Sequence, residues 1–577
     1  MPESLEKTVD AKAPSYKSTL YALALIFVFY LLLLLFGLPQ QWTNAQFARP
    51  GYGTADLIDN GDGFGQLLVP ERNDALEHAE SEEAFFPPLW TSLPFVALLL
   101  CIAILPLIRA TEHWWESNFH RFIVAACLAL ITLGYYAFVY PHPVELHWPA
   151  HQIVSADAGW FNKGAAIFIN AILGEYVSFI VLLFSLFSIT GGIRISGDLK
   201  ATPLVNSAIL AVGALLASFV GTTGAAMLLI RLLLETNQHR KHKVHTVVFF
   251  IFCVCNVGGC LLPIGDPPLF LGYLRGVAFL WTFHLWAEWL FCCGILIALY
   301  YVIDALIYYP KEMPLDKIVD DVMKTPLKIS GLFPNLFCLI GVVLAVMLLD
   351  PAQEFLALFG VKTGLYPPMF LREFVQLAMV FISFAFGSNA VRKENNFNFG
   401  AITEVAALFF GIFICMQAPL QILNAKGAEL TSAVDKYASK IGLNEPKEFF
   451  WLSGCLSSVL DNAPTYVVFF ETARAAYEGE LKEATLNGDV EKAEKIEAEL
   501  NEAKSKSGVP IPIALLTAVS IGSVFMGAMT YIGNGPNFMV KAIAEQSGVK
   551  TPSFFGYMGY SLCILLPILI IMTVIFL

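Results

Sequence analysis

The sequence predicts an all-α polytopic membrane protein with eleven transmembrane helices plus two re-entrant hairpins, built as two inverted-topology repeats with broken helices. Three observations lead to this prediction. Of the 577 residues, 57% are hydrophobic and only 14% are charged, whereas charged residues make up about 25% of a soluble domain. Two apolar stretches have polar centres, and two short segments match each other. Lipid must therefore form part of the solvent of this chain.

Composition and motifs exclude several classes of function. The formal net charge of −12 argues against nucleic acid as a partner. All eleven cysteines lie in apolar segments, so neither a disulfide framework nor a zinc ribbon is indicated. The chain has no G-x-x-x-x-G-K-[ST], H-E-x-x-H or G-x-S-x-G motif. We therefore expect neither an ATP-driven pump nor an enzyme, and no cofactor other than transported or coupling Na⁺.

Long apolar runs mark the predicted spans. They lie at residues 19–38, 89–108, 122–140, 163–190, 246–279, 281–308, 332–349, 370–388, 401–423, 511–546 and 554–577. Lys7, Lys12 and Lys17 precede the first run, so the positive-inside rule predicts a cytoplasmic N-terminus. Segment 1–88 should hold the first span and an acidic outside loop at 39–88. The expected location is the cell (inner) membrane. An odd number of spans then places the C-terminus on the outer side of this membrane.

Two further apolar stretches, residues 203–235 and 448–473, do not fit as single spans. Each has a polar or Gly/Pro-containing centre, and arms of about 12–17 residues are too short to cross roughly 30 Å of hydrocarbon. We expect re-entrant hairpins, because irregular backbone at that depth is tolerated only inside protein or beside a cavity. Basic residues such as Arg194, Lys200 and Arg240 flank the first hairpin, which predicts cytoplasmic entry. The second is predicted to enter from outside.

A short internal match supports an inverted repeat. Residues 264–271 (IGDPPLFL) align with 532–539 (IGNGPNFM), so that Asp266 faces Asn534. Each copy interrupts an apolar stretch and follows a hairpin, as paired Gly/Pro breaks do at transporter binding sites. The predicted parts are a first repeat at 89–309 with a broken helix at 246–279, a cytoplasmic linker helix at 310–330, and a second repeat at 331–577 with a helical insert at 474–509 and a broken helix at 511–546.

The breaks and the hairpin tips supply the candidate site residues. A helix broken near the membrane midplane frees carbonyls that can coordinate Na⁺, and half-helix N-termini attract anions. The candidates are Gly221, Thr222, Thr223, Asn256, Gly265, Asp266, Pro267, Asp461, Asn462, Thr465, Gly533, Asn534, Gly535 and Asn537. Na⁺ is expected at Thr222, Thr223, Asp266, Asp461, Asn462 and Asn534. One ion would lie at the first tip and first break, and another at the second pair.

Structural interpretations compete with these functional ones. Segment 221–224 could serve small-residue helix packing, and Asp266 could be only a helix N-cap. Asp461 is costly to bury at the depth of a hairpin tip, so it is by default a functional residue and the candidate carrier of a transported proton. Glu175 and Glu404 are also embedded in apolar segments, but they lie near neither break in the sequence.

Four phrases of the chain resemble the ion transporter superfamily, namely ASFVGTTGAAMLLIR, NVGGCLLPIGDPPLFLGYL, SSVLDNAPTYVVFF and YIGNGPNFMVKA. From about residue 89 onward the chain is most similar to its CitMHS-like citrate-transporter branch and its NhaD-type sodium:proton antiporter branch. The resemblance implies eleven spans with two hairpins, a homodimer, and a scaffold domain beside an elevator-like transport domain. The dicarboxylate branch has Ser-Asn-Thr at both tips, whereas these tips read Gly-Thr-Thr and Asp-Asn-Ala-Pro-Thr.

Two functions remain open at this point. The main expectation is a sodium:proton antiporter working by alternating access, because Asp266 and Asp461 would bind cations and repel a polyanion. The alternative is a sodium-coupled citrate or dicarboxylate transporter, which the neutral Thr and Asn side chains and the Gly amides permit. A channel is disfavoured, since paired inverted breaks suit alternating access better. The expected partners are small ions or a small organic anion, the lipid bilayer, and a second copy of the chain.

Overall fold

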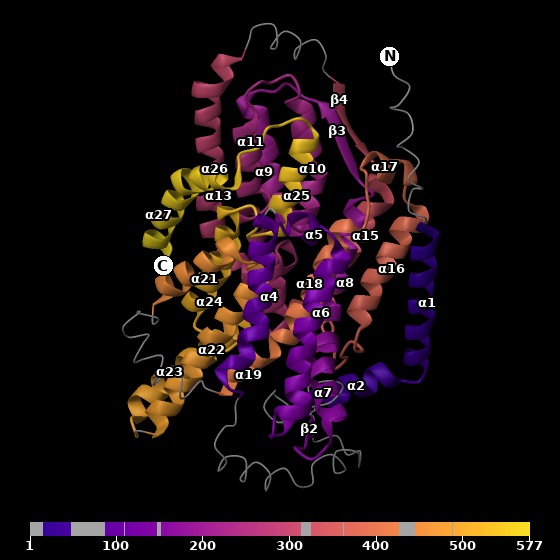
Figure 1. Ribbon diagram of the computed structural model, residues 1–577, viewed down its shortest axis with the longest axis vertical. Coiled ribbons are helices and arrows are strands. Elements are labelled where there is room, and N and C mark those ends of the chain that lie inside the picture. The colour runs from indigo at the N-terminus through magenta and orange to yellow at the C-terminus, as the bar shows by residue number, and fades with distance from the viewer. Residues whose placement is uncertain are drawn as a thin grey trace. The chain divides into compact units, whose positions relative to one another are not determined.

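The structure, a computed structural model, describes residues 16–47, 87–108, 110–146, 152–312, 325–361, 363–425, 445–486 and 488–577. Most of the predicted acidic loop and of the predicted linker helix lies outside these described residues. Within them the chain is helical apart from two small sheets (Figure 1).

Among the described residues, six helices are long and apolar enough to cross a membrane, or seven if one bent pair counts as a single span. The six are Lys17–Leu35, Asn118–Val139, Trp160–Thr190, Pro203–Val220, Trp281–Lys311 and Phe554–Phe576. The bent pair joins Gly400–Cys415 to Gln417–Leu423 at 40°. Shorter apolar helices are Leu89–Ile104, Val244–Cys260, Leu332–Leu348 and Ile513–Met529. The chain is therefore a multi-pass membrane protein, as its composition predicts.

The helices outside the predicted hairpins and breaks have clear bounds. They are α1 (Tyr16–Leu35), α2 (Leu38–Phe47), α4 (Leu93–Ile104), α5 (Glu112–Trp115), α6 (Asn118–Gly134), α7 (Trp160–Ile169), α8 (Val177–Thr190), α13 (Trp286–Ile303), α15 (Leu332–Leu348), α16 (Leu371–Phe386), α17 (Asn389–Glu394), α18 (Gly400–Cys415), α19 (Gln417–Ala425), α26 (Phe554–Tyr560) and α27 (Leu566–Phe576). A π-helical segment, Asn170–Tyr176, joins α7 to α8. Such π segments occur frequently at functional sites.

Four short strands depart from the predicted all-α fold. Strand β1 (Val144–Leu146) pairs antiparallel with β2 (Gln152–Val154), and β3 (Arg194–Asp198) pairs with β4 (Thr325–Ser330). Strand β4 occupies the end of the predicted linker helix at 310–330, so residues 325–330 correct that prediction. Pro326 lacks the backbone donor that a helix interior requires, and the β-branched Ile329 favours a strand. In the same way, helix α2 occupies the start of the predicted outside loop.

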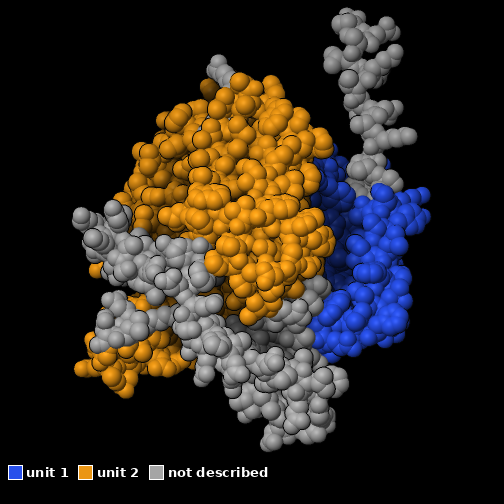
Figure 2. Space-filling view, turned by 60° about the horizontal axis from the view of Figure 1, so that its bottom comes forward, with its two compact units in different colours: residues 1–44, 181–194, 329–403 blue, residues 45–180, 195–328, 404–577 orange. Residues whose placement is uncertain are grey.

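The described chain divides into two compact units, which Figure 2 colours separately. Unit 1 comprises residues 1–44, 181–194 and 329–403, and unit 2 comprises residues 45–180, 195–328 and 404–577. Within unit 1, the Tyr30 hydroxyl of α1 donates to the Met369 carbonyl at 2.7 Å. The Ser383 hydroxyl of α16 donates to the Asn335 amide oxygen of α15 at 2.6 Å. Every candidate site residue belongs to unit 2.

The first predicted hairpin consists of helices α9 (Pro203–Val220) and α10 (Thr222–Thr236). They meet at Gly221, whose φ of +80° and ψ of 150° suit glycine far better than any residue with a Cβ. Asn206 near the start of α9 and Asn237 after α10 exchange two amide hydrogen bonds of 2.9 and 2.8 Å. The two outer ends of the pair therefore lie together, and the chain reverses at Gly221. At 18 residues, α9 is slightly longer than the arm predicted for it.

The second predicted hairpin consists of α21 (Pro446–Val459) and α22 (Asn462–Leu486). A capping box between Glu445 and Glu448 begins α21, which satisfies backbone donors at its first turn. The rings of Phe449 on α21 and Phe469 on α22 lie 6.5 Å apart, so the two helices run in opposite directions from a turn at 460–461.

Helix α22 continues past the predicted end of the hairpin. It runs unbroken for 25 residues into the predicted insert, and α23 (Val490–Ser507) then returns along it. Ala484, Ile496 and Leu500 form the small core between the two helices. The predicted boundary at residue 474 is therefore not a structural break, because residues 471–486 are rich in Ala and Glu, which favour helix.

Both predicted broken helices consist of two short helices joined by irregular backbone. In the first, α11 (Val244–Cys253) and α12 (Pro267–Leu274) are separated by 3₁₀ turns at Val257–Cys260 and Pro263–Gly265. In the second, α24 (Ile513–Phe525) and α25 (Gly535–Gln546) are separated by a turn at Met526–Met529. Proline in the first turn of α12 and of α25 fits because those positions lack an intrahelical partner for a backbone N–H.

Candidate functional site

The buried carboxylate of Asp266 links both hairpins to the second break. Its Oδ1 atom accepts from the Thr222 hydroxyl at 3.1 Å and from the Asn534 amide at 3.2 Å. Its Oδ2 atom accepts from the Asn462 amide at 2.8 Å. Asp266 is 1% exposed, and a charge buried to this degree is stable only when it is satisfied by donors or by a cation.

A chain of asparagines extends this cluster across the two breaks. The Asn534 amide also lies within 3.0 Å of the Cys255 carbonyl and 3.2 Å of the Asn256 amide oxygen. The Asn256 amide donates to Asn537 at 2.7 Å. Asn537 in turn donates to the Gly527 and Thr530 carbonyls, both at 2.9 Å. These side chains therefore satisfy the carbonyls that the irregular backbone leaves without helical partners.

Four helices begin at the Asp266 carboxylate. Helix α10 starts at Thr222 and α22 at Asn462, while α12 and α25 start directly after Asp266 and Asn534. Since Thr222, Asn462 and Asn534 all donate to Asp266, the four N-termini converge on one point. Helix N-termini carry unsatisfied N–H groups and partial positive charge, so this point favours a negative charge.

The contacts of the two halves repeat with the spacing of the internal sequence match. The Ser218 hydroxyl, at the end of α9, donates to the Gly258 carbonyl at 2.6 Å. Its counterpart Ser458, at the end of α21, donates to the Met526 carbonyl at 3.1 Å. Gly258 and Met526 are separated by the same 268 positions as Asp266 and Asn534. Hairpin and break are therefore joined in the same way in both halves.

Glycines allow the backbones of each break to approach closely. A Cβ at Gly265 would lie 2.2 Å from the Gly259 carbonyl oxygen. At the equivalent position, a Cβ at Gly533 would lie 2.6 Å from the Gly527 carbonyl oxygen. Neither position has room for a larger residue, because distances below 3.0 Å are not tolerated by real Cβ atoms. This explains the Gly in both copies of the motif.

The structure brings together six of the predicted site residues, namely Thr222, Asn256, Asp266, Asn462, Asn534 and Asn537. Four of the six predicted Na⁺ ligands, Thr222, Asp266, Asn462 and Asn534, are thus connected in a single network. Gly221, Gly265 and Gly533 shape the tips and breaks rather than offering side chains, and Pro267 begins α12.

Asp461 lies outside this network and caps α22. Its Oδ1 atom accepts from the Ala463 backbone N–H at 3.1 Å, and it is half-buried rather than buried. The Thr465 hydroxyl bonds back to the Asp461 carbonyl at 3.0 Å. Thr223 is half-buried on the first turn of α10, and Gly535 is exposed. These four predicted residues therefore border the cluster, and their roles remain predictions.

One polar atom of the cluster has no partner in the described part of the chain. The Asn462 side-chain oxygen is buried without a hydrogen-bond donor, while its amide nitrogen bonds to Asp266. A buried, unpartnered amide oxygen beside a carboxylate suits a hard cation, which takes oxygen ligands. Na⁺ is such a cation, so the donor set of the cluster fits it.

Sequence reasoning missed a buried ion cluster at the far end of α12. Arg275 bonds to Glu175 at 2.8 Å and to Glu471 at 3.2 Å. The signal for this cluster is weak in the sequence, because its three members are up to 296 positions apart and nothing in the sequence indicates that they meet. The other embedded acid noted above, Glu404, pairs with Arg121 at 2.8 Å.

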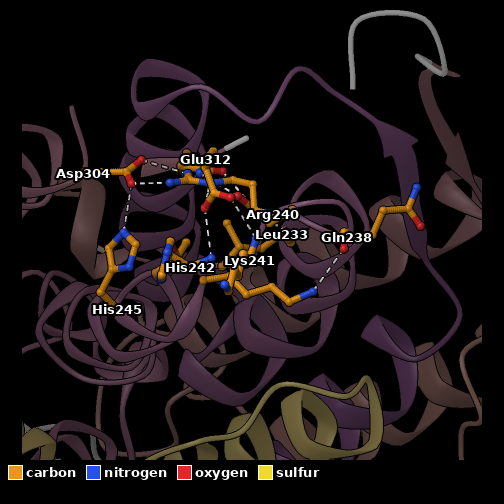
Figure 3. A network of polar contacts seen from close by, with 12 residues as sticks. Leu233, Gln238, Arg240, Lys241, His242, His245, Asp304 and Glu312 are labelled. Carbon is orange, nitrogen blue, oxygen red and sulfur yellow. Dashed lines mark hydrogen bonds and ion pairs between the residues drawn. The ribbon is translucent and has the colours of Figure 1, made fainter. Parts of the chain in front are cut away.

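A second network, shown in Figure 3, stabilises the loop that follows the first hairpin. Arg240 donates to Asp304 at 2.9 Å, and His245 lies 2.9 Å from the same carboxylate. Glu312 accepts from the backbone N–H groups of Lys241 and His242 at 3.0 and 2.9 Å. These contacts fix the loop 237–243 to the end of the α13 helix and form no part of the Asp266 cluster.

One family model matches almost the whole described chain. A family model with the description "Putative citrate transport" matches residues 86–577. The match includes both hairpins, both breaks and every candidate site residue, and it confirms the resemblance to the citrate-transporter branch. No curated protein matches the sequence.

Proposed function

From the premise that the chain belongs to this citrate-transport family and is a secondary transporter rather than an enzyme, we propose that it couples the uptake of citrate, or of a related carboxylate, to Na⁺. The observation that carries the proposal is the buried Asp266 carboxylate, which accepts from Thr222 and Asn462 of the two hairpins. A cation bound there would contact both hairpins, and we expect the hairpins to move apart when the site opens. Substrate binding and alternating access would then depend on the same ion.

The electrostatics of the cluster accommodate an anionic substrate. Each helix N-terminus contributes a partial positive charge of at most about half a unit, so the four together bring the charge balance at the Asp266 carboxylate close to neutral. A Na⁺ ion bound to the Asp266 carboxylate and the Asn462 amide oxygen raises this balance further. A carboxylate of the substrate is then attracted to the remaining N–H groups, and more strongly once the cation is bound. This removes the argument that a buried Asp would repel a polyanion.

Sodium:proton exchange is the second candidate function. It is favoured because Na⁺ and H⁺ would compete for the same buried carboxylate of Asp266. Asp461, the predicted proton carrier, is a further candidate for the same role. The family match favours carboxylate transport over exchange. An Asp461→Asn variant tests the exchange hypothesis, because it keeps the size of the side chain and its hydrogen bond to Ala463 while removing the charge.

The proposed architecture retains eleven spans and two hairpins in two inverted repeats. The N-terminus is cytoplasmic and the C-terminus outside, in the cell inner membrane, and the protein works as a homodimer. The matching contacts of Ser218 and Ser458 support the repeat. The reversal of the chain at both tips supports the hairpins.

We expect purified protein in proteoliposomes to accumulate labelled citrate under an inward Na⁺ gradient. The initial rate should exceed that under an equal K⁺ gradient by about tenfold or more, because Na⁺ is the proposed coupling ion and a selectivity of ~1.4 kcal/mol corresponds to a factor of ten. The lumenal pH should not change unless citrate is present. If Na⁺ instead alkalinises or acidifies the lumen without citrate movement, the exchanger is the correct function.

A further inference from the structure

Polar side chains connect helices α12 and α22 at two points, and the two points are separated by the same number of residues in both segments. Helix α12 starts after Asp266, and α22 starts at Asn462, where the amide donates to Asp266 at 2.8 Å. Arg275 follows nine residues after Asp266, and Glu471 follows nine residues after Asn462. Their side chains bond at 3.2 Å. The two helices therefore run in the same direction and in register, with one polar contact at each end of α12.

The helices are also in close contact between these two points. A Cβ at Gly272 on α12 would lie 2.3 Å from the Tyr466 hydroxyl oxygen on α22. Tyr466 is 1% exposed, and its hydroxyl leaves no room for a side chain at Gly272. Close packing of this kind transmits a displacement at one end of a helix to the other.

The contact between Arg275 and Glu471 also involves a third helical segment. Arg275 also donates to Glu175 at 2.8 Å, and Glu175 lies in the π-helical segment Asn170–Tyr176. The side chains of Arg275 and Glu471 are only 9% and 7% exposed. Buried ionic contacts of this kind are poor stabilisers of a fold but can fix the alignment of its elements. In the described chain, Arg275 Nη1 lacks a hydrogen-bond partner and Glu471 Oε2 has only an ion pair with Arg474 at 3.7 Å, so the cluster is not optimised for stability alone.

We propose that Arg275 is a positioning residue for the coupling-ion site. Through Glu471 it holds α22 in register with α12, and this register keeps the Asn462 side chain against Asp266. The proposal rests on the proposed function, because it assigns Arg275 a role in the affinity for the coupling cation. It is specific to the second hairpin, since the position equivalent to Arg275 in the second repeat is Ile543.

The test is a double-mutant cycle between Glu471 and Asn462, measured as the Na⁺ concentration that half-saturates citrate uptake. Glu471→Ala should raise this concentration about tenfold and change the maximal rate less than twofold, because it misplaces a ligand without removing one. In an Asn462→Ala background, Glu471→Ala should add no further shift, since no ligand remains to be positioned. The conservative Glu471→Gln variant, which can still accept from Arg275, should give a smaller shift in the same direction.

The matched control is Glu480→Ala on the same helix. Glu480 pairs with Lys492 of α23 at 3.1 Å, and its side chain is 40% exposed, so its loss should leave the Na⁺ dependence unchanged. Additive shifts of Glu471→Ala and Asn462→Ala, or a change in maximal rate alone, would overturn the proposal. If Glu471→Ala does not fold, the same cycle with Glu471→Gln decides, and additivity or the absence of a shift again overturns it. A wild type without Na⁺-driven citrate uptake would instead refute the proposed function.

Discussion

Replacement of Asp266 by Asn should reduce Na⁺-driven citrate uptake by on the order of a hundredfold while the protein still inserts and folds. The carboxylate accepts three hydrogen bonds, from Thr222, Asn462 and Asn534. An amide at this position keeps one acceptor oxygen but turns an NH₂ group toward at least one of these donors. Each buried polar group left unpaired costs ~1–3 kcal/mol, and 1.4 kcal/mol corresponds to about a tenfold change in affinity. The loss of the negative charge adds to this effect on cation binding.

A second buried carboxylate provides the control for Asp266. Asp304 is 0% exposed and bonds to Arg240 and His245 rather than to either break. Asp304→Asn should lower the yield of folded protein but leave the Na⁺ concentration for half-maximal uptake unchanged. Equal Na⁺ dependence in wild type and Asp266→Asn, with comparable amounts of folded protein, would show that Asp266 does not bind the coupling ion.

Replacement of Gly265 by Ala should reduce citrate uptake almost as strongly as Asp266→Asn does. The added Cβ would lie 2.2 Å from the Gly259 carbonyl oxygen and 3.0 Å from the Ser218 Cα. Both are backbone atoms, which cannot rotate away, so the first break must widen. Overpacking in a tight core costs ~1–3 kcal/mol or more. Because Asp266 is the next residue, the displacement also moves the carboxylate. Citrate uptake per folded molecule and the melting temperature measure the two effects separately.

The pseudo-symmetry of the breaks supplies a matched variant for Gly265. Gly533→Ala would bring a Cβ within 2.6 Å of the Gly527 carbonyl oxygen and 2.7 Å of the Ser457 carbonyl oxygen. It should therefore impair uptake to a similar extent. Gly294→Ala on α13 meets no atom within 4 Å and should behave like the wild type. A fully active Gly265→Ala variant would contradict the close approach on which the description of the break rests.

The hairpins and breaks could be predicted from the sequence because local chemistry determines them. Pro267 and Pro536 cannot continue a preceding helix, and Gly221 adopts a backbone conformation that favours glycine. The match between the two segments then identified Asp266 and Asn534 as equivalent. Thr222 and Asn462 followed because they stand at the tips. For these residues the sequence pattern and the structure agree.

Pairings between distant segments could not be predicted in the same way. Asn256 and Asn537 are separated by 281 positions, and nothing in the sequence indicates that their side chains meet. The sequence does not indicate that the Asp266 carboxylate accepts from both hairpins, and the two predicted ion sites stay a prediction. Arg275 directly follows a recognisable phrase, but its partners Glu471 and Glu175 are 196 and 100 positions away, and the sequence does not indicate that they meet. The continuation of α22 into the insert was missed because the change from apolar to charged residues suggested a boundary where the backbone has none.

The most direct test of the central claim, that both hairpin tips hold one coupling cation at Asp266, is the Na⁺ dependence of citrate uptake in Thr222→Ala and Asn462→Ala. Each variant removes one hydrogen bond to the same carboxylate. Thr236→Ala, at the far end of α10, removes a buried hydroxyl that has no hydrogen-bond partner in the described chain, and it is the control. The account predicts that the half-saturating Na⁺ concentration rises several-fold in both tip variants and not in the control. Unchanged values in both tip variants, with normal amounts of folded protein, would contradict it.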